Sequence, residues 1–242
     1  MKLDSRELEV SAHRGLWRAM PGLKGKPDRQ AFVVKVYTIL FFQMFITTVI
    51  TAMGLYDPSY SHFLKANING LYWIATIIVI STMISLMCCS HLARTVPVNY
   101  ILLLIFTLAE SYVVASITQF YEPTDVLISA ILASTLFVSL TAYAISTDDD
   151  LEISAGFCCS FFFVLLSMVV LICIWPSQFL LTMLGALLCA LASIYIIYDT
   201  KIIAGGGRYE LTYDDYIVGA LLLYTDLIYL FLQILECFGR RR

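Results

Sequence analysis

The chain has 242 residues, of which 60% are hydrophobic and 14% charged, and its mean hydropathy is +0.84. A soluble domain is roughly 45–50% apolar, so this composition excludes an ordinary soluble protein and predicts an integral membrane protein. The net charge of -3 says little about partners, because eight of the 15 basic residues lie in the first 35 positions.

Apolar runs long enough to cross a bilayer predict the fold. A hydrocarbon core of about 30 Å needs around 20 apolar residues per helix. Seven such runs are present, joined by short connectors that carry helix breakers: 32–55, 69–92, 98–119, 126–146, 154–175, 178–199 and 216–238. We therefore predict an all-α integral membrane protein, a seven-transmembrane-helix bundle over 32–239, preceded by a flexible cytosolic tail at 1–31 and followed by a basic end at 240–242.

The distribution of basic residues predicts the orientation. A cytosolic N-terminus places 11 Lys and Arg residues on the cytosolic side and four on the other, as the positive-inside rule requires. Three of those four are the terminal arginines at 240–242, which favour a cytosolic C-terminus. A re-entrant segment at 216–238, in place of a seventh crossing, stays open as an alternative.

Three acidic residues lie at membrane depth, where an ionised side chain is costly and usually functional. Glu110 and Asp226 fall near the middle of the third and seventh runs. Asp199 lies in the last turns of the sixth, which we expect to continue to Ala204 before Gly205 ends the helix. That extension brings Asp199 inside the membrane, about two turns from Asp226 in height.

Two carboxyl groups facing each other with little water would share one proton. In the protonated state a hydrogen bond would tie the sixth helix to the seventh. In the deprotonated state the carboxylates would repel and offer oxygen ligands to a hard cation such as Ca²⁺. Asp199 and Asp226 are therefore our candidate gate and candidate Ca²⁺ site, and Arg94 is the nearest basic group that could hold a carboxylate in the closed state.

Simpler interpretations of these residues stay open. Glu110 could be a neutral carboxyl bonded to a nearby hydroxyl, and Asp199 a helix-end carboxylate facing water. Asp214 and Asp215 are accessory acids that we expect to cap the last helix, where the helix dipole favours negative charge. The seven cysteines include no CxxC pair, which favours packing over a disulfide framework.

Several motifs at these positions resemble the transmembrane Bax-inhibitor-motif family, in its lifeguard branch. The resemblance covers about residues 30–239. Its most specific markers are Tyr198-Asp199-Thr200 and Leu223-Tyr224-Thr225-Asp226-Leu227-Ile228; the others are Arg29 to Tyr37, Phe106 to Glu110, Phe120-Tyr121, Gly185 to Leu188 and Tyr213 to Tyr216.

The resemblance implies a seven-helix Bax-inhibitor fold acting as a pH-sensitive calcium leak of the Golgi or endoplasmic reticulum, linked to calcium homeostasis and inhibition of apoptosis. It places the family's paired aspartates on Asp199 and Asp226 and its latch arginine close to Arg94, and Glu110 would line or support the path. It implies no enzymatic activity and no cofactor, with Ca²⁺ as the transported ion. The implied partners are the lipid bilayer and other membrane proteins of apoptosis, not nucleic acid.

Other function classes fit less well. An intramembrane aspartyl protease needs a Gly-x-Gly-Asp motif, where this chain has Leu223-Tyr224-Thr225-Asp226. A serine intramembrane protease needs a deep histidine, and none of the three histidines lies deep in an apolar run. A non-conducting scaffold that regulates cell death through protein partners is the alternative that stays open.

Overall fold

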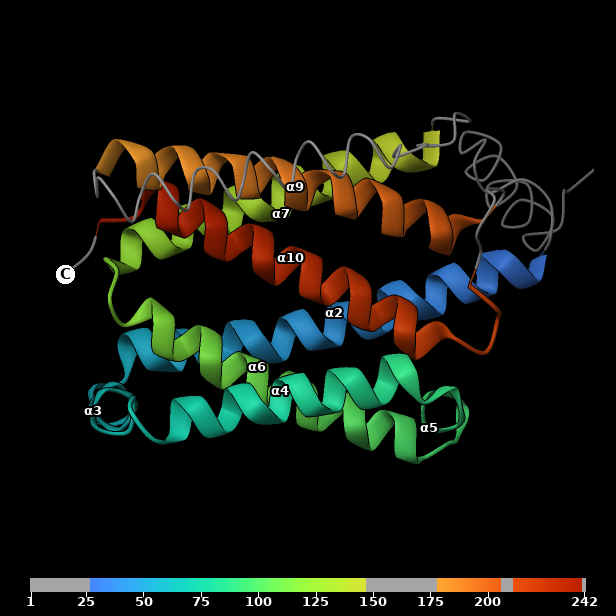
Figure 1. The fold of residues 1–242 in the computed structure, drawn as a ribbon, viewed down its shortest axis with the longest axis horizontal. Helices are drawn as coiled ribbons and strands as arrows, with labels where there is room; N and C mark the ends of the chain where they lie inside the picture. Colours follow the sequence, from blue (N-terminus) through green and yellow to red (C-terminus); the bar gives the residue numbers. More distant parts are fainter. Residues whose placement is uncertain (1–26, 147–177, 206–210, 241–242) are drawn as a thin grey trace, which may run out of the picture.

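The computed structural model describes residues 27–146, 178–205 and 211–240, and every regular element in these ranges is a helix. The helices pack into one elongated bundle (Figure 1). Their bounds are α2 Pro27–Tyr56, α3 Pro58–Ala66, α4 Leu71–Cys88, α5 Ser90–Arg94, α6 Val98–Thr118, α7 Pro123–Ser146, α9 Gln178–Ala204 and α10 Tyr216–Phe238.

Six of these helices are long and apolar enough to cross a membrane: α2, α4, α6, α7, α9 and α10. They correspond to six of the seven predicted runs, and α10 has the predicted bounds. The predicted run at 154–175 lies outside the described residues. The chain is therefore a multi-pass membrane protein, and the part that the structure describes is all-helical.

Three features differ from the sequence prediction. The first span begins at Pro27, so the last residues assigned to the tail belong to α2. The second run is interrupted at Cys89, which separates α4 from α5. The short helix α3 was not predicted, although Asp57 and Pro58 signal its start: the Asp57 carboxylate accepts a hydrogen bond from the Ser59 amide at 2.9 Å, and proline suits the first helical turn.

The helix α10 forms the centre of the bundle. Of its most apolar 18-residue window, 67% of the residues are buried, against 17% for α4. It lies between α7 and α9 on one side and α2 and α6 on the other (Figure 1). A span that contacts protein on most of its circumference can carry polar side chains away from lipid.

The helices α7 and α9 run in the same direction, although they are consecutive among the described spans. Both begin beside the C-terminal end of α10. The amide of Glu122, before α7, donates to the carbonyl of Arg240 at 3.2 Å, and the Cys237 thiol lies 4.0 Å from the carbonyl oxygen of Thr182 in α9. Both therefore end on the face of the bundle where α2 begins.

The end of α9 is fixed by Gly205 and Arg29. Gly205 has a φ of 80°, a left-handed conformation that strains any residue with a Cβ atom. The buried Arg29 guanidinium donates to the carbonyls of Ile202 at 2.6 Å and Leu211 at 2.7 Å. Arg29 thereby holds the first span against the segment that connects α9 to α10.

We predict that Gly205→Ala destabilises the bundle by about 1 to 3 kcal/mol, the usual range for a non-glycine residue held in this conformation. The added Cβ would also lie 2.6 Å from the Arg29 Nε atom. Thermal unfolding in detergent measures the effect. Gly70→Ala is the matched control, because a Cβ there meets nothing within 4 Å. Equal unfolding temperatures for the two variants would contradict the prediction.

Candidate functional site

The helices α9 and α10 bring Asp199 and Asp226 together. The two carboxyl groups interact directly, side chain to side chain, although their sequence positions placed them about two turns apart in height. Asp199 is 8% exposed. The Oδ2 atom of Asp226 is buried and has no hydrogen-bond partner among the described residues. The two carboxyl groups therefore lie close together with little access to solvent.

Gly185 allows a close approach of α9 and α10 near the C-terminal end of α10. A Cβ on Gly185 would lie 2.6 Å from the Cys237 Sγ atom, so one of the two would have to move. Small residues at a membrane helix interface allow such close packing. At Gly219, towards the start of α10, a Cβ would lie 3.3 Å from the Val36 side chain and 3.4 Å from that of Ile203, so the packing there is less tight.

Glu110 lies apart from this pair, on α6, where it is half-buried near Tyr224. Tyr224 belongs to a buried cluster of hydroxyl groups: the Thr47 Oγ1 atom is 2.8 Å from the Tyr224 hydroxyl and 2.9 Å from the Ser111 Oγ atom. Residues 224 and 226 point to nearly opposite sides of a helix. Glu110 and the aspartate pair therefore lie on different sides of α10.

The predicted latch residue, Arg94, binds Asp215. The Arg94 Nε atom donates to Asp215 Oδ1 at 2.8 Å, and Nη2 donates to Oδ2 at 2.9 Å. This bidentate ion pair lowers the pKa of the Asp215 carboxyl. Asp215 occupies the predicted N-cap position of α10, but its side chain makes no capping hydrogen bond, and Asp214 is exposed. Arg94 thus joins α5 to the start of α10, and no described bond links it to Asp199 or Asp226.

A second group of hydroxyls, which includes the residue after Asp199 in the chain, was not found from the sequence. The Tyr37 hydroxyl on α2 faces those of Thr141 on α7 and Thr200 on α9, next to Asp199. None of the three oxygens has a hydrogen-bond partner at bonding distance among the described residues. Three separate spans supply this cluster, so no local sequence pattern could have predicted it.

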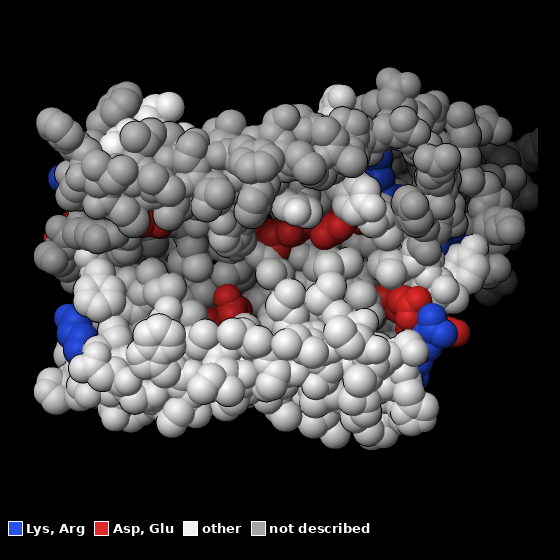
Figure 2. All heavy atoms as spheres, in the orientation of Figure 1, with Lys and Arg blue, Asp and Glu red and all other residues white. Residues whose placement is uncertain are grey.

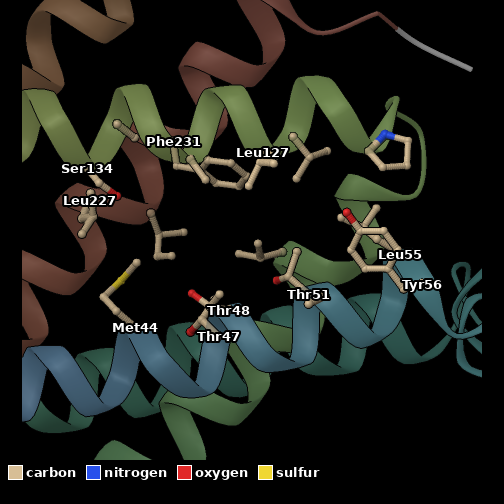
Figure 3. Close-up of a pocket in the computed structure, with 17 residues that line it drawn as sticks. Met44, Thr47, Thr48, Thr51, Leu55, Tyr56, Leu127, Ser134, Leu227 and Phe231 are labelled. Carbon is tan, nitrogen blue, oxygen red and sulfur yellow. The ribbon is translucent and has the colours of Figure 1, made fainter.

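A cavity of about 170 Å³ lies between α2, α7 and α10 (Figure 3). Its walls are mainly apolar, with hydroxyl groups from Thr47, Thr48, Thr51 and Ser134. Met44 and Ser134 lie towards one end and Leu55 and Tyr56 towards the other (Figure 3). Side chains from α2, α7 and α10, with Val114 of α6, form the cavity, which explains why the sequence did not predict it.

Acidic side chains lie along the middle of the bundle and also at its ends, where Asp215 and Asp125 pair with Arg94 and Arg240. Figure 2 shows acidic groups along the middle of one face, while the visible basic groups lie towards its ends. Within the described ranges, no group of three or more His, Cys, Asp and Glu side chains could hold a metal ion. Since bound Ca²⁺ takes six to eight oxygen ligands, two carboxyls suit a passing ion better than a resident one.

Comparison with known proteins establishes the family. Residues 29–242 match the family described as Inhibitor of apoptosis-promoting Bax1. The chain belongs to the Bax inhibitor motif family. It is 31% identical to human protein lifeguard 3 over 88% of this chain and 70% of that protein, and 30% identical to the mouse protein over the same shares. It is 33% identical to mouse protein lifeguard 4 over 86% of this chain and 84% of that protein. The sequence resemblance is thus confirmed.

We predict that the Arg94–Asp215 ion pair persists across neutral and mildly acidic pH. A carboxyl with a lowered folded-state pKa contributes stability above its unfolded pKa of about 3.9, and this contribution is lost as pH falls through the folded-state value. The stability difference between wild type and Arg94→Gln should therefore be constant from pH 8 to 5 and shrink below about pH 4. Unfolding midpoints at several pH values test this, and a difference that disappears between pH 7 and 6 would contradict it.

Proposed function

We propose that this protein is a pH-sensitive calcium leak of intracellular membranes, of the Golgi or endoplasmic reticulum, gated by Asp199 and Asp226. The names of its family and of its lifeguard relatives support a role in inhibiting apoptosis. In this proposal the leak serves calcium homeostasis and thereby protects the cell. The observation that carries the calcium part is the direct interaction of two carboxyl groups within membrane-spanning helices.

The carboxyl pair gives a physical reason for pH sensitivity. With one shared proton, the two groups attract and hold α9 against α10. With none, two negative charges repel at short range in a poorly solvated site, and the contact opens. The open state exposes carboxylate oxygens, which are ligands that Ca²⁺ prefers. Higher cytosolic pH therefore favours conduction, and lower pH favours closure.

The Arg94–Asp215 pair acts as the latch of the closed state in this mechanism. It joins α5 to the first residue before α10, on the face where α9 ends. Since its carboxylate stays ionised near neutral pH, the latch itself does not respond to the proton. It restrains α10 so that opening requires loss of the proton at Asp199 and Asp226.

We propose seven crossings with a cytosolic N-terminus. Consecutive membrane spans alternate in direction, whereas α7 and α9 are parallel. This arrangement supports one further crossing between them, which makes seven. The helix α10 is continuous from Asp215 at one face to the Asp125 contact of Arg240 at the other, which favours a full crossing over a re-entrant segment. Among the described residues, Arg29, Lys35, Arg94 and Lys201 lie towards the face where α2 begins, and Lys65 and Arg240 towards the opposite face, which supports a cytosolic N-terminus.

We predict that purified wild-type protein in liposomes conducts Ca²⁺ more rapidly at pH 8 than at pH 6. Asp199→Asn and Asp226→Asn should each abolish this pH dependence, because an amide cannot ionise. Asp214→Asn is the matched control, since Asp214 is an exposed acid at the turn before α10. Fluorescent Ca²⁺ indicators inside the liposomes measure the flux.

The same experiment separates the leak from a scaffold. Flux that none of the aspartate substitutions alters would contradict the carboxyl gate. No flux above protein-free liposomes at any pH, from protein shown to be folded, would contradict the leak. The non-conducting scaffold that acts through protein partners would then be the better account.

A further inference from the structure

The cavity between α2 and α7 has an ordered antiparallel arrangement. Moving along α2 from Met44 towards Leu55 corresponds to moving along α7 from Ser134 towards Pro123. Thr51 and Leu127 lie between these ends on opposite walls (Figure 3). The register of α2 against α7 is therefore known over the length of the cavity.

The same register continues beyond the cavity to the second hydroxyl group. Tyr37 lies seven residues before Met44 on α2, and Thr141 lies seven residues after Ser134 on α7. Seven residues are two helical turns, about 10 Å, so each pair occupies the same helix face. Tyr37 and Thr141 do face each other, beside Thr200, the residue that follows Asp199 in the chain. One groove thus contains the cavity and, about two turns further along, the hydroxyl cluster.

By this register, Leu40 on α2 and Phe137 on α7 fall between the two polar sites. Leu40 is 4% exposed and Phe137 is 7% exposed, and both belong to the same buried apolar cluster. Their chain neighbours point outwards: Phe41 is 66% exposed and Val138 is 65% exposed. The groove therefore consists of a mainly apolar cavity with several hydroxyl groups, an apolar section, and a hydroxyl cluster that includes the residue after Asp199.

Both polar sites contain buried hydroxyls without described partners. Thr51 is 9% exposed, lines the cavity, and its Oγ1 atom has no hydrogen-bond partner among the described residues. Thr200 is 1% exposed, and its Oγ1 atom likewise has no hydrogen-bond partner among the described residues. Buried polar groups are almost always satisfied, so these oxygens indicate places that water occupies. At about 30 Å³ per molecule, the cavity has room for roughly six waters.

We propose that Leu40 and Phe137 form the hydrophobic gate of a water-filled cation path, with the cavity as its entrance and the Tyr37, Thr141 and Thr200 cluster leading to the aspartate pair. This inference rests on the proposed calcium leak and names its route. The entrance lies towards the face opposite the start of α2. Threonine, serine and tyrosine hydroxyls offer neutral oxygens to a partly hydrated cation along both polar sections.

An apolar constriction of this kind stops ions without a charged barrier. Water leaves a narrow apolar section, and an ion that enters without its hydration shell has no replacement ligands there. Opening therefore requires α2 and α7 to separate at Leu40 and Phe137. The hydroxyl cluster provides the link to the proton gate, because Thr200 directly follows Asp199 on α9 and faces Tyr37 on α2.

The first test is Ca²⁺ flux through Phe137→Ala in liposomes at pH 8, where the aspartate gate is open and the constriction is the remaining barrier. We expect an increase of about tenfold, since a shorter side chain lets water into the constriction. Val138→Ala is the matched control and should leave flux at the wild-type level, because its side chain points outwards. Leu40→Ala and the outward-facing Phe41→Ala repeat the comparison on α2, and circular dichroism verifies that each variant is folded.

The outcomes separate this inference from the leak itself. A wild-type flux that neither Phe137→Ala nor Leu40→Ala raises would overturn the hydrophobic gate and leave the aspartate gate intact. No flux from the wild type or any of these variants would overturn both.

The second test measures water in the entrance without relying on flux. Two cysteine variants are treated with a charged, membrane-impermeant thiol reagent. Thr51→Cys places the thiol inside the cavity. Val49→Cys places it on the lipid-facing side of the same helix, where Val49 is 41% exposed. Mass spectrometry of the peptides quantifies labelling at each position, apart from the native cysteines. We expect Thr51→Cys to react much faster. Equal, slow labelling of both positions would overturn the water-filled entrance.

Discussion

A carboxyl group among membrane-spanning helices needs a proton, a partner or water, and Asp199 and Asp226 supply each other with part of that need. Their interaction lies at the contact between α9 and the central helix α10. Gly185 allows α9 and α10 to approach closely, and α9 ends at Gly205. Any change in the protonation of the pair therefore acts on the helix that contacts most of the bundle.

The remaining polar groups occupy separate parts of the bundle around α10. Arg29 and Arg94 stabilise the face where α2 begins through the segments that flank α10. The hydroxyl cluster of Tyr37, Thr141 and Thr200 extends the polar environment of the pair towards α2 and α7. Glu110 lies on the other side of α10, beside Tyr224, and is better placed to support packing around that hydroxyl network than to bind the same ion.

Much of the fold was predictable because the bilayer imposes one helix length on every crossing. The bounds of α10 and the extension of α9 to Ala204 followed from apolar runs and from the glycine that ends α9. The acidic candidates were also predictable, because an acidic residue inside a long apolar run is easily seen in the sequence. The helix α3 was missed because Asp57-Pro58 was interpreted only as a helix breaker, although the same pair begins a helix.

The sequence could not predict which distant groups meet. Arg94 and Asp215 are 121 positions apart, and the role predicted for Asp215 was the local one of an N-cap. The cavity and the hydroxyl cluster use single residues from several spans, so they depend on the register between helices. Helical periodicity gives the face of each residue but not the partner helix that this face contacts.

The central claim is that Asp199 and Asp226 share one proton and lose it to solvent as the pH rises from 6 to 8. Infrared difference spectroscopy of the protein in liposomes, between pH 6 and pH 8, measures this through the carbonyl band of a protonated carboxyl group. The account predicts such a band at pH 6 that is lost at pH 8 and is absent from the difference spectrum of Asp226→Asn. A wild-type spectrum with no pH-dependent carboxyl band, or one that Asp226→Asn leaves unchanged, would contradict it.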